Sequence, residues 1–397
     1  MINERMRELG ARRSAIREIF EYGLKRKAEI GAERVFDFSL GNPSVPAPDA
    51  VNCELRRLID GLPSVSLHGY TSAGGDLSVR QAVAEYITAT QGYPVTAGDL
   101  YMTVGAAAAL TSTLGALVGR GEEVILLSPY FPEYRVFAEG VGATVLEVEC
   151  RRSDFHPDAA AIAAAITEKT AAIIINSPNN PTGAVYTEDE IREIAKVLTD
   201  AEKKYGHPIY LIADEPYREL VYGGAVVPFI PKLYGNTVVC YSFSKSLSIP
   251  GERIGYVLVP RDMDDKVAVY DAIAGAARSF GYVCAPSLLQ KMLPGVLGLT
   301  ADIAVYDENR RVLYAELTRL GFEMIAPDGA FYMFMKSPVE DAGEFCEAAK
   351  RHDLLLVPSD SFGIGGYVRI SYCVDLEMIK RSLPAFAALA AEYRQGE

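Results

Sequence analysis

The sequence contains no tryptophan, few histidines and no closely paired cysteines. Without tryptophan, any aromatic stacking on a ligand must use Tyr or Phe. The four histidines lie far apart in the chain, and the six cysteines form no CxxC pair. A disulfide framework would be denser in cysteine and a zinc site would pair its ligands. We therefore expect no metal site, and reduced thiols in a cytosolic protein.

Positive charge and long apolar runs are also scarce. Lys and Arg number 39 against 52 Asp and Glu, which gives a net charge of -13. This balance argues against nucleic-acid binding, whose affinity comes largely from neutralised phosphates, although a local Arg cluster can still hold a small anion. No apolar run reaches the roughly 20 residues that span a bilayer. The first twenty residues carry Glu4, Glu8 and Glu18 and lack an apolar core, so we expect no secretory signal.

What the sequence does contain is a regular alternation of short apolar strands and helices. The predicted strands cover residues 100–104, 123–127, 171–175, 209–213 and 237–241. The predicted helices cover residues 76–90, with Asp76 in the first turn, 106–117, 159–166 and 187–204. The last of these opens on Thr187-Glu188-Asp189-Glu190, which has the form of a capping box. The alternation predicts an α/β fold with a largely parallel sheet covered on both faces.

Both ends of the chain differ from this alternating region. The start predicts a helix over residues 14–30, a strand over 35–40 and a Pro-rich crossing up to Pro48. The end predicts helices over 301–320 and 342–351, strands over 331–335, 354–357 and 367–371, and a terminal helix. At roughly 150 residues per domain, 397 residues predict two to three domains. We expect a large domain of residues 46–294 and a smaller α+β domain of residues 1–45 plus 295–397.

The residues that follow the predicted strands are chemically informative, because ligands of open α/β sheets bind beyond the carboxyl ends of the strands. Lys245, among Ser and Tyr, is a candidate Schiff-base nucleophile. Asp214 follows another strand and can pair with a protonated ring nitrogen. Ser, Arg and free N–H groups at a helix start form an anion site. Pyridoxal 5'-phosphate has a carbonyl, a basic ring nitrogen and a phosphate, and would use all three.

These residues resemble those of a known family. Residues 179–183 (NNPTG), 213–217 (ADEPY), 242–245 (SFSK) and 253–256 (RIGY) occur in order, with Arg369 near the end. As a set they resemble the class I and II aminotransferases of pyridoxal-phosphate fold type I, similar to aspartate aminotransferase. The resemblance runs along nearly the whole chain. It implies a mostly parallel seven-stranded sheet, and transfer of an amino group between an L-amino acid and a 2-oxo acid in two ping-pong half-reactions.

The resemblance also implies roles for particular residues. Lys245 would form the internal aldimine and then move the proton between Cα and C4′, and Asp214 would keep the ring nitrogen protonated. The other implied cofactor contacts are Asn180 and Tyr217 on the phenolic oxygen, Phe131 stacked on the ring, and Ser242, Arg253, Gly105, Ala106 and Ala107 at the phosphate. Tyr70 would reach the phosphate of the other subunit, which implies a homodimer. Arg369 would hold the substrate α-carboxylate, with Gly41 and Asn180 close by.

Several alternatives remain open at this stage. Residues 105–109 (GAAAA) offer the phosphate no side-chain donor, and Tyr130 or Tyr134 could cover the ring in place of Phe131. Arg278 is a candidate for a distal substrate acid but is better explained as a solvated charge, and Cys284 stands where the family often has Asn. The same fold supports C–S β-lyases and other reactions through a Cα carbanion. A DNA-binding regulator is disfavoured by the acidic charge and the short N-terminal segment. The amino donor cannot be predicted.

Overall fold

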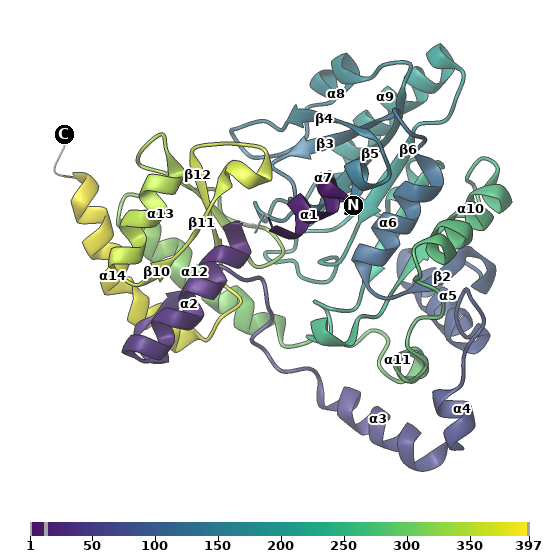
Figure 1. The fold of residues 1–397 in the computed structure, drawn as a ribbon, viewed down its shortest axis with the longest axis horizontal. Helices are drawn as coiled ribbons and strands as arrows, with labels where there is room; N and C mark the ends of the chain where they lie inside the picture. The colour runs from purple at the N-terminus through teal and green to yellow at the C-terminus, as the bar shows by residue number, and fades with distance from the viewer. Residues whose placement is uncertain (1, 12–14, 395–397) are drawn as a thin grey trace.

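The computed structural model describes residues 2–11 and 15–394, and a seven-stranded sheet lies at its centre (Figure 1). Its strands, in spatial order, are β2 (Leu100–Thr103), β8 (Gly255–Leu258), β7 (Thr237–Ser242), β6 (Tyr210–Asp214), β5 (Thr170–Asn176), β3 (Glu123–Ser128) and β4 (Thr144–Glu149). β8 pairs antiparallel with both neighbours, and the other pairings are parallel. Six strands therefore run in one direction, so their carboxyl ends share one edge with the start of β8.

Alternating side chains of these strands divide between the two faces of the sheet. Ile125 and Leu127 belong to one hydrophobic cluster, and Val124 and Leu126 belong to another. The first cluster includes side chains of α5 (Leu77–Gln91), α8 (Ala159–Ala165) and α9 (Glu188–Tyr205). The second includes side chains of α6 (Ala106–Leu117), α7 (Glu133–Gly140) and α10 (Lys266–Ser279). The period-two alternation thus buries both faces under helices, as a parallel sheet requires.

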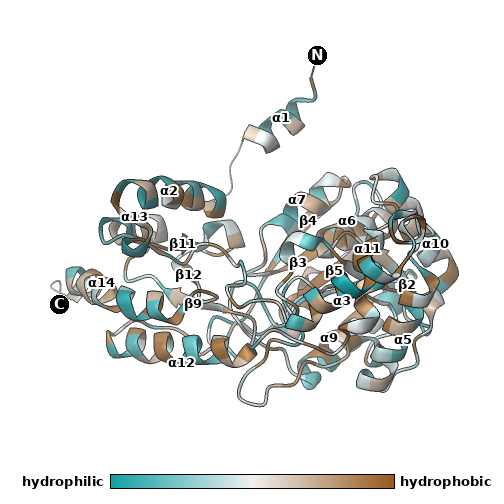
Figure 2. Cartoon of the chain, turned by 90° about the horizontal axis from the view of Figure 1, so that it is seen from below, coloured by the Kyte–Doolittle hydropathy of each residue, from teal (hydrophilic) through white to brown (hydrophobic). Residues whose placement is uncertain are grey.

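A smaller region combines the two ends of the chain. β1 (Phe36–Asp37) pairs with β10 (Leu354–Leu355), and β11 (Val357–Pro358), β12 (Tyr367–Ser371) and β9 (Tyr332–Lys336) form an antiparallel sheet. Figure 2 shows helices on both sides of these strands. On one side lie α2 (Ala15–Ile30) and α13 (Ala342–Arg351), and on the other α12 (Ile303–Arg319) and α14 (Leu376–Arg394). We call this region the small lobe and the seven-stranded sheet with its helices the large lobe.

The remaining helices lie at the periphery. They are α1 (Glu4–Ala11), α3 (Asp49–Gly61), α4 (Ser64–His68) and α11 (Ser287–Met292). Short 3₁₀ turns occupy Ala32–Arg34, Ala97–Asp99, Ile230–Lys232, Pro250–Glu252, Leu293–Gly295 and Ser359–Phe362. Helix α1 has no buried residue and projects from the surface (Figure 2), where Arg5 donates to the Glu139 carbonyl of α7. Within the described ranges, every helix is too short or too polar to cross a lipid bilayer.

Most predicted elements are present, with shifts that have local causes. The helices over 106–117 and 342–351 and the strand over 367–371 have the predicted bounds, and the Thr187–Glu190 capping box forms. Asp76 is not in the first turn of its helix, because its side chain caps the helix by accepting from the Ser78 N–H. The strand predicted over 35–40 is limited to Phe36–Asp37, and that over 354–357 is split between β10 and β11. Ser14, the predicted start of α2, lies outside the described residues.

Strands β4 and β8 and helices α1, α3, α4, α7, α10 and α11 were not predicted from the sequence. β4 is half-exposed along most of its length, so it lacks the continuous apolar run that marked its neighbours.

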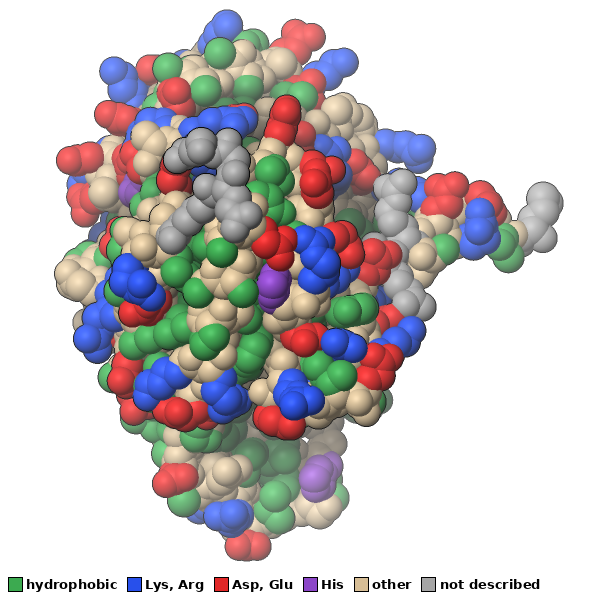
Figure 3. Space-filling model, turned by 90° about the vertical axis from the view of Figure 1, so that its left-hand side faces the viewer, with side chains coloured by type: hydrophobic (Ala, Val, Ile, Leu, Met, Phe, Trp, Pro, Cys, Tyr) green, Lys and Arg blue, Asp and Glu red, His purple; other side chains and the backbone are tan. Residues whose placement is uncertain are grey.

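On the face of the small lobe drawn in Figure 3, basic and acidic side chains are interspersed. The negative net charge is therefore not gathered into one patch on that face.

Candidate active site

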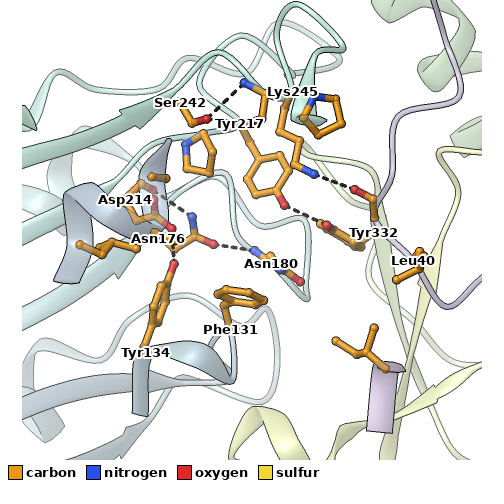
Figure 4. A pocket seen from close by; sticks show the side chains of 18 of the residues that line it. Leu40, Phe131, Tyr134, Asn176, Asn180, Asp214, Tyr217, Ser242, Lys245 and Tyr332 are labelled. Carbon is orange, nitrogen blue, oxygen red and sulfur yellow. Dashed lines mark hydrogen bonds between the residues drawn. The ribbon is translucent and has the colours of Figure 1, made fainter. Parts of the chain in front are cut away.

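The shared edge of the large sheet borders a cavity of about 310 Å³ (Figure 4). Asp214 ends β6, Ser242 ends β7, and Asn176 ends β5. Arg253 lies two residues before β8, which starts at this edge because it runs against its neighbours. The chain order of the strands thus brings side chains from positions 176 to 253 together. The small lobe closes the opposite side with Gly41, Tyr332 and Arg369.

Asp214 is buried, with 5% of its surface exposed. The Tyr134 hydroxyl donates to its Oδ2, and the Asn176 side chain donates to its backbone carbonyl at 2.9 Å. Its Oδ1 has no hydrogen-bond partner among the described residues. Burial raises the pKa of Asp214 to about 7, with a smaller contribution from Glu215, and the Tyr134 hydroxyl opposes the shift. A buried carboxylate with one unpaired oxygen is a site for a cationic partner.

Lys245 lies three residues after β7 and points into the cavity (Figure 4). Its Nζ donates to the Gly41 carbonyl at 2.7 Å, which joins the two lobes. Burial lowers the pKa of Lys245 to about 8; Cys373 opposes the shift, and the cations Arg369 and Arg253 add to it. A larger fraction of this amine is therefore neutral near physiological pH than for an exposed lysine, which suits a nucleophile.

Tyr217 and Tyr332 form a buried pair beside Lys245. Their hydroxyl oxygens lie 2.8 Å apart. A Cβ atom at Gly41 would collide with the Tyr332 hydroxyl, so the small residue allows the crossing segment to approach. Tyr332 was not predicted as a site residue, and no local signal marks it. It is one residue of an apolar strand, and it reaches the cavity only because the small lobe packs there.

A second group of polar atoms lies where β2, β7 and β8 meet. The Ser242 and Ser244 hydroxyls are 2.7 Å apart, and Arg253 Nη1 donates to Ser244 Oγ at 3.4 Å. Gly105 has φ +83°, and a Cβ atom there would lie 2.6 Å from Arg253 Nη2. Helix α6 begins at Ala106, and the first N–H groups of a helix have no partner within it. Serine hydroxyls, a guanidinium and a helix start together suit an anion.

Arg369 is almost fully buried on β12, with 2% of its surface exposed. Its Nη1 donates to Asn180 Oδ1 at 3.1 Å, and its Nη2 donates to the Ser39 carbonyl at 2.5 Å. Burial lowers its pKa, although nearby tyrosines oppose the shift. Nε has no acceptor among the residues that the structure describes. The side chain is therefore fixed in position and keeps hydrogen-bonding capacity for a further anion.

The structure distinguishes the aromatic candidates. Phe131 lines the cavity and meets the Tyr134 ring edge-on, with centroids 5.6 Å apart. Tyr134 is bound to Asp214, and the Tyr130 hydroxyl donates to Glu147 away from the cavity. Tyr70 is 98% exposed and does not line the cavity of its own chain, so its predicted contact with the phosphate of the other subunit stays a prediction.

Arg278 and Cys284 are also absent from the described lining of the cavity. Arg278 is exposed near the end of α10, in agreement with a solvated charge. Cys284 has φ +60°, and its thiol donates to the Thr71 carbonyl at 3.4 Å.

Sequence reasoning missed several side chains that line the cavity. Asn176 ends β5 and would have been found had that strand been extended by one residue. For Tyr134 the sequence indicates only an alternative cover for the ring; its hydrogen bond to Asp214 depends on helix α7, which was not predicted. The other missed side chains are apolar, and nothing in the sequence separates them from core residues: Ile16, Leu40, Leu110 and Phe137.

Comparison with known proteins agrees with this fold. Residues 33–386 match the family of class I and II aminotransferases. The chain therefore belongs to the class I and II aminotransferases, and its fold is the aspartate aminotransferase-like type I fold of pyridoxal-phosphate enzymes. This membership supports a transaminase.

Individual relatives are named as aminotransferases. A probable aspartate/prephenate aminotransferase of Thermus aquaticus is 31% identical over 87% of this chain and 89% of its own length. An aminotransferase structure from Eubacterium rectale is 53% identical, with a TM-score of 0.97 over 99% of each chain. The aspartate aminotransferase of Thermus thermophilus, solved with maleate, is 28% identical, with a TM-score of 0.86 over 96% of this chain and 98% of its own.

Proposed function

We propose that this protein is a pyridoxal 5'-phosphate-dependent aminotransferase. It would move an amino group between an L-amino acid and a 2-oxo acid in two half-reactions by a ping-pong mechanism. One observation carries the proposal: the Lys245 amine, the Asp214 carboxylate and the Arg369 guanidinium border the same cavity. The amine can attach to a cofactor carbonyl, the carboxylate can pair with a ring nitrogen, and the guanidinium can bind a substrate carboxylate.

The residues present fit this cofactor. Asp214 Oδ1 and Arg369 Nε are buried polar atoms without partners among the described residues, and each belongs to the cavity. The anion-binding group around Ser242, Arg253 and Gly105 lies at the same sheet edge as Lys245. An acidic partner for the ring nitrogen, an amine for the carbonyl and a cradle for the phosphate are thus all available.

The cofactor, when bound, supplies an electron sink for negative charge that develops at the substrate Cα. Asp214 holds a proton on the ring nitrogen through a buried charge-assisted hydrogen bond. Tyr217 and Asn180 hold the phenolic oxygen, and Phe131 packs on the ring. Ser242, Arg253 and the N–H groups of Gly105, Ala106 and Ala107 hold the phosphate, together with Tyr70 of the partner subunit.

The remaining residues act on the substrate. Arg369 orients its α-carboxylate by a bidentate pair, with Gly41 and Asn180 beside the same group. Lys245 is the amine that attaches the cofactor. With the cofactor and substrate bound, Lys245 Nζ would move the proton between the substrate Cα and C4′. The lowered pKa of Lys245 favours the neutral amine that both tasks require.

The proposal extends to the assembly and its location. Tyr70, Val65 on α4 and Ile59 on α3 are 98%, 85% and 56% exposed, which supports a homodimer with shared active sites. Separate hydrophobic clusters support two domains, which we place at 46–294 and 1–45 plus 295–397, with Tyr217, Leu220 and Tyr222 of the first packed into the cluster of the second. We place the protein in the cytoplasm and in amino-acid biosynthesis. Its cysteines are free thiols in the structure, which suits a reducing compartment.

The test combines absorbance with product analysis. The purified protein, loaded with pyridoxal phosphate, should show a near-visible band that shifts when an amino acid is added. Glutamate should then form from 2-oxoglutarate at the expense of the donor. A protein that binds the cofactor but releases pyruvate and ammonia from cystathionine without any 2-oxo acid is a C–S β-lyase, and the proposal is then wrong.

A further inference from the structure

We propose that Gln290 is a positioning residue for the cofactor phosphate, and that it acts on the site of the other subunit through the loop that carries Tyr70. The inference rests on the proposed function, in which Tyr70 reaches the phosphate of the other subunit. The loop comprises residues 69–76 and joins α4 to α5. We call it the Tyr70 loop. Gln290 lies on α11, far from this loop in the sequence.

Little of Tyr70 is packed against its own chain. Its side chain is 98% exposed, and it does not line the cavity of that chain. A side chain that meets a phosphate on another chain loses conformational freedom on contact, and this loss costs less when the backbone is fixed beforehand. The contribution of Tyr70 therefore depends on how the rest of its loop is held.

The amide of Gln290 holds this loop at two points. Gln290 is fully buried, and its Oε1 accepts from the Asp76 N–H at 2.8 Å. Its Nε2 donates to Thr71 Oγ1 at 3.3 Å and to the Ala285 carbonyl at 2.6 Å. One buried side chain thus joins the residue directly after Tyr70, the end of the loop and the segment before α11.

Two further contacts press the loop against the same region. The Cys284 thiol donates to the Thr71 carbonyl at 3.4 Å, so the hydroxyl and the carbonyl of Thr71 are both bound. A Cβ atom at Gly75, which has φ +103°, would lie 2.3 Å from the Met102 side chain and 2.8 Å from Gln290 Oε1. The loop is therefore packed closely on β2 and α11, directly beside its exposed tyrosine.

The amide is the feature of Gln290 that matters, because it offers an acceptor and two donors at once. Gln290→Met has a similar volume but forms none of the three hydrogen bonds. The ion pair between Lys291 and the Asp76 carboxylate, at 2.8 Å, still holds the end of the loop in this variant. The change should therefore loosen the loop mainly at Thr71, next to Tyr70.

Cofactor affinity measures this effect without turnover. Equilibrium dialysis of the apoprotein gives the dissociation constants of pyridoxal phosphate and of pyridoxal, which lacks the phosphate. In Gln290→Met the constant for pyridoxal phosphate should rise about tenfold, and that for pyridoxal should change less than about twofold. Gln81→Met, at an exposed position on α5, is the matched control and should change neither. An unchanged affinity for pyridoxal phosphate, or an equal loss for both probes, overturns the inference.

A milder variant covers the case in which Gln290→Met does not fold. Thr71→Val removes the hydroxyl that Gln290 contacts at a half-exposed position, and Thr71→Ser keeps a hydroxyl there. The dissociation constant of pyridoxal phosphate should rise about threefold in Thr71→Val and stay within about twofold of the native value in Thr71→Ser. Equal binding by the two variants overturns the inference.

Tyr70→Phe separates this inference from the proposed function. It should weaken the binding of pyridoxal phosphate about tenfold, and adding Gln290→Met should change little further, because both act through one hydroxyl. Additive losses overturn the inference, as does native binding in Gln290→Met beside a weakened Tyr70→Phe. If Tyr70→Phe binds like the native protein, the contact across subunits in the proposed function has itself failed, and the inference falls with it.

Mixed dimers show whether the effect crosses the subunit boundary. Two differently tagged chains are co-expressed, and Lys245→Ala on one of them restricts covalent cofactor attachment to the other. With Gln290→Met on the Lys245→Ala chain, the absorbance of the attached cofactor should report an affinity about tenfold weaker. With Gln290→Met on the chain that keeps Lys245, the affinity should equal that of a dimer without Gln290→Met. Any other pattern overturns the inference.

Discussion

The two sides of the cavity are built in different ways. One side, which we call the sheet side, carries Asp214, Ser242 and Lys245 at or just after the ends of neighbouring strands of one sheet. The other, the small-lobe side, carries Leu40, Tyr332 and Arg369 from both ends of the chain. The sheet side holds the groups of the proposed cofactor chemistry, which every substrate shares. In the proposed function the small-lobe side would meet the substrate, so it could vary without disturbing the sheet.

Lys245→Ala tests the sheet side most directly. Loss of the amine removes both the attachment point and the group that moves the Cα proton. We expect turnover with any donor to fall at least about a thousandfold, together with loss of covalent cofactor attachment. Glutamate production and absorbance measure the two effects. Lys196→Ala, at an exposed position on α9, is the control and should leave both unchanged. Normal turnover in Lys245→Ala would remove this residue from the mechanism.

Asp214→Asn keeps the shape of the side chain but removes its charge. A buried ionic partner of the ring nitrogen would be lost, at a cost of about 3 kcal/mol, or roughly a hundredfold in rate. Single-turnover conversion of the bound cofactor measures the change. The loss should be similar for all donors, because the proposed function assigns Asp214 to the cofactor ring and not to the substrate side chain. A loss confined to one donor class contradicts this division of labour.

Arg369→Lys perturbs the small-lobe side instead. The positive charge remains, but the planar bidentate geometry is lost, which should lower kcat/KM about thirtyfold. The spectrum of the loaded enzyme should not change, because Arg369 is assigned to the substrate. Arg192→Lys on the exposed face of α9 is the control. A large spectral change with normal kcat/KM would move Arg369 to the cofactor side.

The sheet side was also the part that the sequence predicted best. Apolar strands of four to six residues end at chemically distinctive residues. In a parallel sheet the carboxyl ends of neighbouring strands lie at the same edge, so these residues are expected to lie close together. The sequence alone therefore predicts that Asp214, Ser242 and Lys245 lie at one edge of the sheet. Strands β4 and β8 were not predicted, but the predicted position of the site at this edge does not depend on them, because neither strand contributes a site residue within its own span.

The small-lobe side was predicted only where a resemblance named its residues, as for Arg369 and Gly41. Tyr332, Leu40 and Ile16 are apolar or aromatic residues in apolar surroundings, and their sequence pattern is that of core residues. They become wall residues through the packing of two chain ends against the sheet, which no local spacing encodes. Substrate preference was for this reason beyond the reach of the sequence.

The pH dependence of cofactor attachment tests the lowered pKa of Lys245. Burial lowers the pKa of Lys245 to about 8, and only the neutral amine attacks a carbonyl. The rate of attachment to the apoprotein should rise about tenfold per pH unit below this value and level off above it. Stopped-flow absorbance between pH 6 and about 9.5 gives the profile. A rise that continues up to this upper limit without levelling off would indicate an ordinary exposed lysine.

The smallest expected effect comes from Tyr332→Phe, at the point where the two sides touch. The Tyr332 hydroxyl lies 2.8 Å from that of Tyr217 and can donate to it, which leaves the Tyr217 proton for the cofactor's phenolic oxygen. Loss of one such hydrogen bond costs about 1 kcal/mol, or roughly fivefold. We expect the pH midpoint of the absorbance band to rise, because the phenolate is less stabilised, and kcat to fall about fivefold. Tyr314→Phe, on α12 outside the cavity, is the control. A changed KM with an unchanged pH midpoint would mean that Tyr332 acts on the substrate alone, and the two sides would then be coupled only through Lys245 and Gly41.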